Sequence, residues 1–189
     1  MKIQTCTEND ARFIYYSIRE RLAAYEIAPL LGWDITNVSE EEGSASWDLI
    51  YSAGTEFNIG EIKLRKQNLH EFDEAEYPGL IFEKKKYDAL MTLSQSPKGI
   101  ETNIQPKFIL VLKDCIAIYD VNKVQPTDFK MVNLRSKSVN GSDAREMKNV
   151  TYLQPEEFTI INHIVNTDNI SIRARIIFEY RYPNTKLIL

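Results

Sequence analysis

A tight hairpin in the middle of the chain constrains the fold more than any other feature of the sequence. Residues 46–52 and 57–65 each indicate an apolar strand, and Gly54 lies in the short segment between them. A two-residue type II′ turn requires glycine at its first central position, which is where Gly54 stands. Because this turn fixes the register of the two strands, the sequence places Asp48 directly opposite Glu61.

These two acids share one face of the predicted sheet with Lys63. Directly opposed residues have Cβ atoms about 4.5–5.5 Å apart, and Lys63, two residues beyond Glu61, points to the same side. Two adjacent carboxylates repel each other, and a hard divalent cation compensates this repulsion. We therefore predict a Mg²⁺ site, with Mn²⁺ as a substitute, held by Asp48, Glu61 and the backbone carbonyl of Ile62. Lys63 would orient or help deprotonate an attacking water, an arrangement suited to phosphodiester hydrolysis.

The remaining pattern predicts a single α/β domain. The expected helices are residues 9–26 and 78–94, and the expected strands are residues 33–38, 46–52, 57–65, 107–112 and 115–121. The first helix is expected to bury Ala11, Ile14, Ile18, Leu22 and Tyr25. Residues 1–125 would form the core, and residues 126–189 an extension that packs on the same domain. Within the extension, residues 136–149 suggest a polar loop, and the alternation of apolar side chains over residues 170–182 predicts a late strand.

Asp48 is followed, after twelve intervening residues, by Glu61-Ile62-Lys63, within an α-β-β-β-α-β order of elements. This combination resembles the PD-(D/E)XK nuclease superfamily, over about residues 9–121 in element order but at only four or five positions in sequence. Trp47 stands where the family pattern has proline. The resemblance implies a restriction-endonuclease-like core, a central mixed sheet flanked by helices. It also implies Mg²⁺-dependent hydrolysis of DNA, with Asp48 and Glu61 on the metal and Lys63 assisting the water.

The resemblance also points to residues on the two helices, without selecting a single glutamate on the first. Many family members carry a glutamate on the first helix, but here Glu20 lies opposite the apolar face and Glu26 flanks it, so periodicity selects neither. On the second helix a run of charges is typical of a solvated face. Within it, Lys84 lies beside the apolar stripe and can reach a phosphate, and Lys86 matches a position where the family often has lysine or glutamine. We predict both lysines to bind nucleic acid.

Composition limits the partners. The net charge is −4 and the pI is near 5.3, so non-specific coating of nucleic acid or of anionic membrane is excluded and any DNA contact must be local. No signal peptide or membrane-spanning segment is evident, and Cys6 and Cys115 fit neither a disulfide framework nor a zinc cluster, so we expect a cytoplasmic protein. The resemblance to these nucleases also implies a homodimer, since one centre nicks one strand, and the late strand is the candidate interface.

Two alternatives stay open at this point. The first is a nuclease-like fold that no longer cuts and serves as a DNA-binding or protein-interaction module. The second is an unrelated α/β scaffold in which Asp48, Glu61 and Lys63 form a solvated sheet face with a Glu–Lys pair of little energetic value. The position of the two acids relative to each other separates these readings from the nuclease hypothesis.

Overall fold

The central hairpin forms in the register that the turn predicts. In the computed structural model, which describes residues 8–39, 47–72, 80–135 and 145–187, β2 (Leu49–Ala53) and β3 (Glu56–Leu64) pair antiparallel. Ala53 lies opposite Glu56 and Leu49 lies opposite Gly60. Gly54 has φ = 62°, a backbone conformation that an L side chain rarely adopts, so the glycine meets the requirement of the turn.

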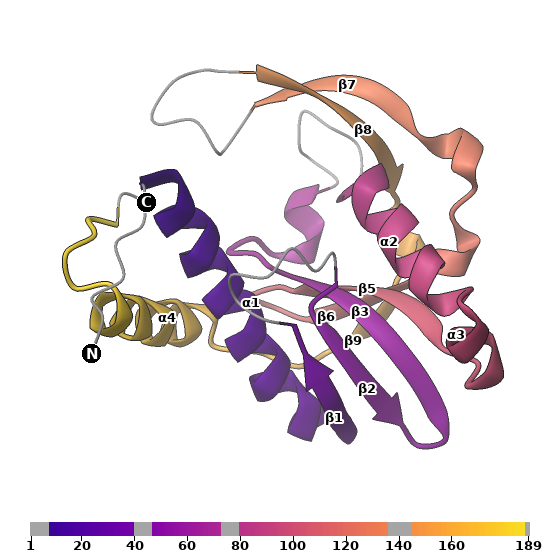
Figure 1. Cartoon of the computed structure of the whole chain (residues 1–189), viewed down its shortest axis with the longest axis horizontal. Coiled ribbons are helices and arrows are strands. Elements are labelled where there is room, and N and C mark those ends of the chain that lie inside the picture. Colours follow the sequence, from indigo (N-terminus) through magenta and orange to yellow (C-terminus); the bar gives the residue numbers. More distant parts are fainter. Residues whose placement is uncertain (1–7, 40–46, 73–79, 136–144, 188–189) are drawn as a thin grey trace.

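The hairpin belongs to a six-stranded mixed sheet of order β1-β2-β3-β5-β6-β9 (Figure 1). The other members are β1 (Trp33–Val38), β5 (Gln105–Val111), β6 (Ile116–Asp120) and β9 (Thr159–Ile161), and β1 and β9 lie at the edges. The pair β3–β5 is parallel and all other neighbours are antiparallel. The prediction of a central mixed sheet flanked by helices is thus confirmed, with strand bounds close to those expected.

Helices cover both faces of this sheet. Alternate residues of β5 point to opposite sides: Ile109 and Val111 pack with α1 (Glu8–Leu31), whereas Phe108 and Leu110 pack with α2 (Lys84–Ser94). The short helix α3 (Pro97–Glu101) follows α2. The sheet is therefore packed between two hydrophobic cores, one under α1 and one under α2.

The first helix is longer than the sequence predicts. It continues through Pro29 to Leu31, and Gly32, with φ = 64°, ends it. Proline is tolerated here because it removes only one hydrogen bond in the final turn. Tyr25, which we expected on the apolar face, is 57% exposed, so that prediction is wrong. The sheet is covered instead by small residues of the same helix, Ala23 and Ala24, which allow a close approach.

A second sheet contains β4 (Leu80–Glu83), β8 (Arg145–Leu153) and β7 (Lys130–Arg135), in the order β4-β8-β7. Two predictions are corrected by it. The second helix begins at Lys84, because residues 80–83 extend to pair with β8. The polar loop expected at residues 136–149 is a strand from Arg145 onwards, since a partner strand can recruit polar residues that have no apolar alternation of their own. Pro78 and residues 136–144 lie outside the described residues.

Short 3₁₀ turns complete the chain, at Leu69–Phe72, Val121–Lys123, Pro126–Asp128 and Pro155–Glu157. Cys115 is a buried free thiol, and Cys6 lies outside the described residues. Over the described part of the chain, no helix combines the length and the apolar character needed to cross a membrane.

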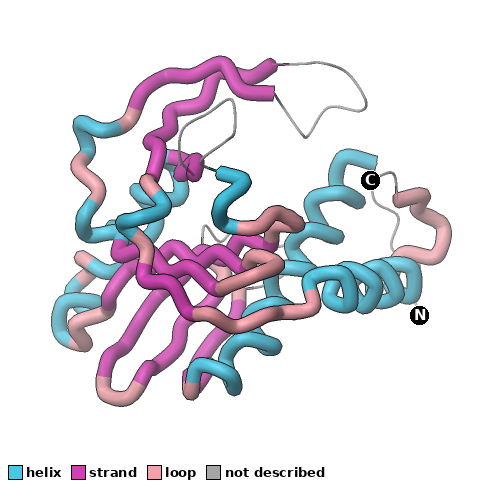
Figure 2. Tube along the Cα trace, turned by 180° about the vertical axis from the view of Figure 1, so that it is seen from behind, coloured by secondary structure: helices cyan, strands magenta, loops and turns pink. Residues whose placement is uncertain are grey.

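The late strand expected at residues 170–182 is wrong, because this segment is helix α4 (Thr167–Arg181). Its buried residues Ile170, Ala174 and Phe178 recur every four positions, a spacing that satisfies both a strand and a helix. A strand would also have buried Ile172 and Ile176, yet both side chains are exposed, at 61% and 60%. Packing decides the outcome: the buried stripe meets α1, and the two helices lie side by side in Figure 2.

Candidate active site

The candidate site lies beside the start of β2, where the edge of β3 beyond Gly60 has no partner strand among the described residues. Asp48, just before β2, still donates its backbone N–H to Gly60 O at 2.8 Å. Beyond that point no strand pairs with β3 on this side among the described residues. The Asp48 carboxylate takes over this role: its Oδ2 accepts the backbone N–H of Ile62 at 2.7 Å. This bond fixes the carboxylate and satisfies a buried donor that would otherwise cost free energy.

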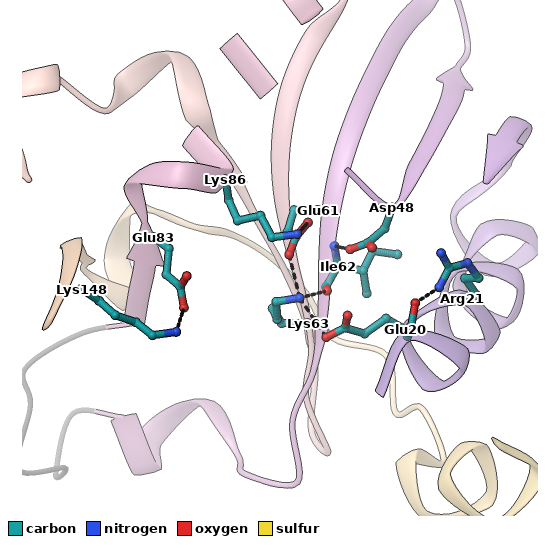
Figure 3. A network of polar contacts seen from close by, with 10 residues as sticks. Glu20, Arg21, Asp48, Glu61, Ile62, Lys63, Glu83, Lys86 and Lys148 are labelled. Carbon is teal, nitrogen blue, oxygen red and sulfur yellow. Dashed lines mark hydrogen bonds and ion pairs between the residues drawn. The ribbon is translucent and has the colours of Figure 1, made fainter. Parts of the chain in front are cut away.

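Glu61 lies next to Asp48 and is completely buried, with an exposed fraction of 0%. One carboxylate oxygen, Oε2, accepts a hydrogen bond from Lys86 Nζ at 2.8 Å. The other, Oε1, lies 2.7 Å from Lys63 Nζ but has no hydrogen-bond partner of acceptable geometry. The predicted neighbours Asp48, Glu61 and Lys63 are therefore gathered at one point, together with Lys86 (Figure 3).

Lys63 directs its hydrogen bonds elsewhere. Its Nζ donates to Glu20 Oε1 at 2.9 Å and to the backbone carbonyl of Ile62 at 3.1 Å. Glu20 comes from α1, on the other side of the sheet, and reaches Lys63 because β2 does not extend alongside this part of β3. Glu20 is thus the glutamate of the first helix that belongs to this cluster, whereas Glu26 forms an ion pair with Arg173.

Periodicity missed Glu20 because α1 buries a polar side as well as an apolar one. Ser17 and Arg21 are buried on that side, and Arg21 donates to both Ser17 Oγ and Ser39. A rule that assigns polar residues to solvent cannot find such a face. The only signal that pointed to Glu20 was the family resemblance, which left Glu26 as an equal candidate.

The protonation states follow from burial and charge. Burial, together with the repulsion from Glu61, raises the pKa of Asp48 to about 7, although Lys63 opposes the shift. Burial also disfavours ionisation of Glu61, but Lys63 and Lys86 outweigh it and hold the pKa of Glu61 below its usual value. For Lys63, burial is outweighed by Glu20 and Glu61, so its pKa rises and it stays an ammonium ion. At neutral pH the cluster therefore contains a Glu61 carboxylate, cationic lysine and an aspartate poised to lose its proton.

The two lysines predicted to bind nucleic acid behave differently. Lys86 points into the cluster and contacts Glu61. Lys84 is not brought to it: its Nζ bonds both oxygens of Asp88 at 2.7 Å and lies 5.9 Å from the centre of the Phe129 ring. Helical geometry explains the difference, since residues two apart on a helix face different directions.

The ligand atoms that the cluster offers are oxygen atoms, which suit a hard divalent cation. Mg²⁺ takes oxygen ligands, and it usually keeps several waters beside one or two carboxylates. Asp48, Glu61 and the Ile62 carbonyl supply oxygen atoms. The buried Glu61 Oε1 accepts no hydrogen bond, and a cation could take the place of the missing donor. Among the described residues, no three His, Cys, Asp or Glu side chains converge as a ready-made metal cluster. The remaining ligands would therefore have to be water or substrate oxygen atoms.

Comparison with known proteins finds a likeness in structure but none in sequence. No family model matches the sequence, and no curated protein matches it. In structure the chain is similar to Hjc, a Holliday junction resolvase from the hyperthermophilic archaeon Archaeoglobus fulgidus. The TM-score is 0.43 and the sequence identity 13%, over 71% of this chain and 86% of that chain. A likeness of this size does not indicate an activity for this chain.

Proposed function

We propose that this chain is a Mg²⁺-dependent deoxyribonuclease of the PD-(D/E)XK type, which hydrolyses DNA phosphodiester bonds at the cluster around Glu61. The observation that supports this most is the convergence of two buried acids, Asp48 and Glu61, with the partly buried Lys63 at an open sheet edge. Burying several charges is expensive and adds little to stability, so such clusters are concentrated at functional sites.

Each residue has a defined role in this proposal. Asp48, Glu61 and the Ile62 carbonyl would hold the cation, which would supply a Lewis acid and a water of lowered pKa. Lys63, kept as an ammonium ion by Glu20, orients the attacking water and stabilises negative charge on the phosphate. Lys86 neutralises Glu61. A cation bound by Glu61 would leave the ammonium group of Lys86 available to contact a phosphate oxygen.

One observation favours an alternative. Lys63 and Lys86 already neutralise both oxygen atoms of Glu61, at 2.7 and 2.8 Å, without a cation. A cluster satisfied in this way is also what a nuclease-like fold would retain after losing catalysis, while it serves as a DNA-binding or protein-interaction module. The alternative predicts that the chain binds a partner but never cleaves DNA.

A plasmid cleavage assay distinguishes the two. With Mg²⁺ or Mn²⁺ the wild-type chain should nick or linearise DNA, and EDTA should abolish this activity. Asp48→Ala and Lys63→Ala should each lower the rate by about 100-fold or more, a loss typical of a removed catalytic group. Asp88→Asn, an acid on α2 outside the cluster, is the matched control and should cleave like the wild type. Cleavage unaffected by both active-site substitutions would exclude the proposed centre.

The proposed partners are DNA and a second copy of the chain. Residues 170–182, our candidate interface, present an exposed apolar stripe of α4, formed by Ile172, Ile176 and Tyr180. A two-fold contact places the same stripe on itself. Arg175 and Glu179 lie on one flank of the stripe, 2.8 Å apart, so two antiparallel copies can exchange this ion pair.

A further inference from the structure

Two arginine residues, Arg19 and Arg65, flank the ion pair of Glu20 and Lys63 in sequence, Arg19 on α1 and Arg65 just after β3. Arg19 directly precedes Glu20 on α1. Arg65 follows Lys63 by two residues, and its backbone N–H donates to Val111 O at 2.9 Å, so it continues the line of β3. Glu61, Lys63 and Arg65 therefore share one face of the strand. Arg65 interacts electrostatically with Arg19 and Glu20 across the gap between strand and helix.

Neither guanidinium group forms a salt bridge within the described part of the chain. Arg19 is 6% exposed, and its Nε has no hydrogen-bond partner there. The acid next to it, Glu20, is taken by Lys63. Burial lowers the pKa of Arg65, Glu20 opposes this effect, and the positive charge of Arg19 adds to it. A buried cation beside a second, partly buried cation is unfavourable unless an anion lies between them.

Arg19 is also held in a defined orientation. Its guanidinium carbon lies 5.7 Å from the ring centre of Tyr15 and 5.4 Å from that of Tyr16. Contact with aromatic faces stabilises the cation without consuming its N–H donors. The donors of Arg19 are thus positioned before any ligand arrives, and positioning in advance lowers the entropic cost of binding.

We propose that Arg19 and Arg65 bind a backbone phosphate of the DNA strand, adjacent to the phosphate that is cleaved. The proposal rests on the proposed function for its substrate. The planar fork of a guanidinium group matches the oxygen atoms of a phosphate, and such charge-assisted pairs are among the strongest hydrogen bonds. Along β3, Arg65 stands about 6.8 Å beyond Lys63, so an anion held there is separate from the reacting group.

Arg65→Gln tests this proposal most simply, because Arg65 is only partly buried at the end of a strand. The dissociation constant of a labelled DNA duplex is measured in EDTA, where no cleavage occurs, over a range of salt concentrations. The substitution should weaken binding about tenfold, the loss of one charge-assisted contact. The slope of log K against log salt should fall in magnitude by about 1. Lys98→Gln, an exposed lysine on α3, is the control and should leave both quantities unchanged.

Two further measurements separate binding from folding. Inorganic phosphate at millimolar concentration should raise the melting temperature of the wild type more than that of Arg65→Gln. Arg19→Lys keeps the charge but loses the planar fork, and it should weaken DNA binding while the chain still melts cooperatively. Equal DNA affinity for wild type and Arg65→Gln would overturn the proposal. So would a melting temperature of Arg65→Gln low enough to unfold the chain during the binding assay, because Arg65 would then be structural.

The DNA-binding and cleavage assays together test the phosphate site separately from the nuclease proposal. If the wild type binds DNA through Arg19 and Arg65 but never cleaves it with Mg²⁺, the phosphate site stands and the nuclease proposal fails. If the wild type cleaves DNA and Arg65→Gln binds it equally well, the nuclease proposal stands and the phosphate site fails. A wild type that binds no DNA overturns both.

Discussion

At the scale of single residues, Asp48 links the candidate site to the stability of the chain. Its carboxyl group has a pKa of about 7 in the folded chain against 3.8 in the unfolded one. The folded state therefore binds an extra proton between these values, and the stability contributed by this group falls as the pH rises from 4 to 7. Above pH 7 the penalty is constant, on the order of 4 kcal/mol.

Urea unfolding at pH 5 and pH 8 without metal measures this effect. Asp48→Asn should lose much of the decrease in unfolding free energy that the wild type shows between the two values, because asparagine does not ionise. Mg²⁺ favours the ionised carboxylate, so it should stabilise the wild type more at pH 8 than at pH 5. An identical pH dependence in wild type and Asp48→Asn would mean that Asp48 is not the titrating group.

In the proposed nuclease, Glu20 would position Lys63, and Glu26 on the same helix provides a control. We expect Glu20→Gln to lower DNA cleavage at least tenfold, because the ammonium group of Lys63 loses the charge that holds it at 2.9 Å. Glu26→Gln removes an exposed ion pair with Arg173 and should leave the rate unchanged. Initial cleavage rates compare the two, and equal rates would remove Glu20 from the site.

At the scale of elements, the hairpin turn determines whether Asp48 and Glu61 meet at all. Gly54→Ala should destabilise the chain by about 1–2 kcal/mol, since an alanine at φ = 62° is strained. Thr55→Ala, the next residue in the same exposed turn, should change stability by less than about 0.5 kcal/mol. Thermal or urea unfolding measures both variants, and a neutral Gly54→Ala would argue against the turn geometry described above.

The elements also show which parts of the fold the sequence can and cannot predict. The register of β2 and β3 was predictable because one glycine determines it locally. Helix α4 was not, because Ile170, Ala174 and Phe178 satisfy a period of two as well as of four, and only contact with α1 decides between them. Strand β8 likewise depends on its partners β4 and β7. Glu20 escaped detection for the same reason, since its contact with Lys63 exists only after the sheet edge has formed.

At the scale of the whole molecule, the exposed stripe of α4 predicts the oligomeric state. Ile176 stands at its centre and is 60% exposed. If two copies pair through this stripe, Ile176→Glu should convert a dimer into a monomer, because each copy then buries a like charge against the other. Light scattering during gel filtration measures the mass, with Ile100→Glu, an exposed apolar residue on α3, as the control. A wild type that is monomeric at micromolar concentration would rule out this interface.

The cation itself provides the most direct test of the central claim. Crystals of the wild-type chain grown with Mn²⁺ and measured at a wavelength where manganese scatters anomalously would locate it without reference to activity. We predict one peak in contact with carboxylate oxygen atoms of Asp48 and Glu61 and with the carbonyl of Ile62, and no peak in Asp48→Asn. An empty position in the wild type, with Glu61 still bound by Lys63 and Lys86, would contradict the account.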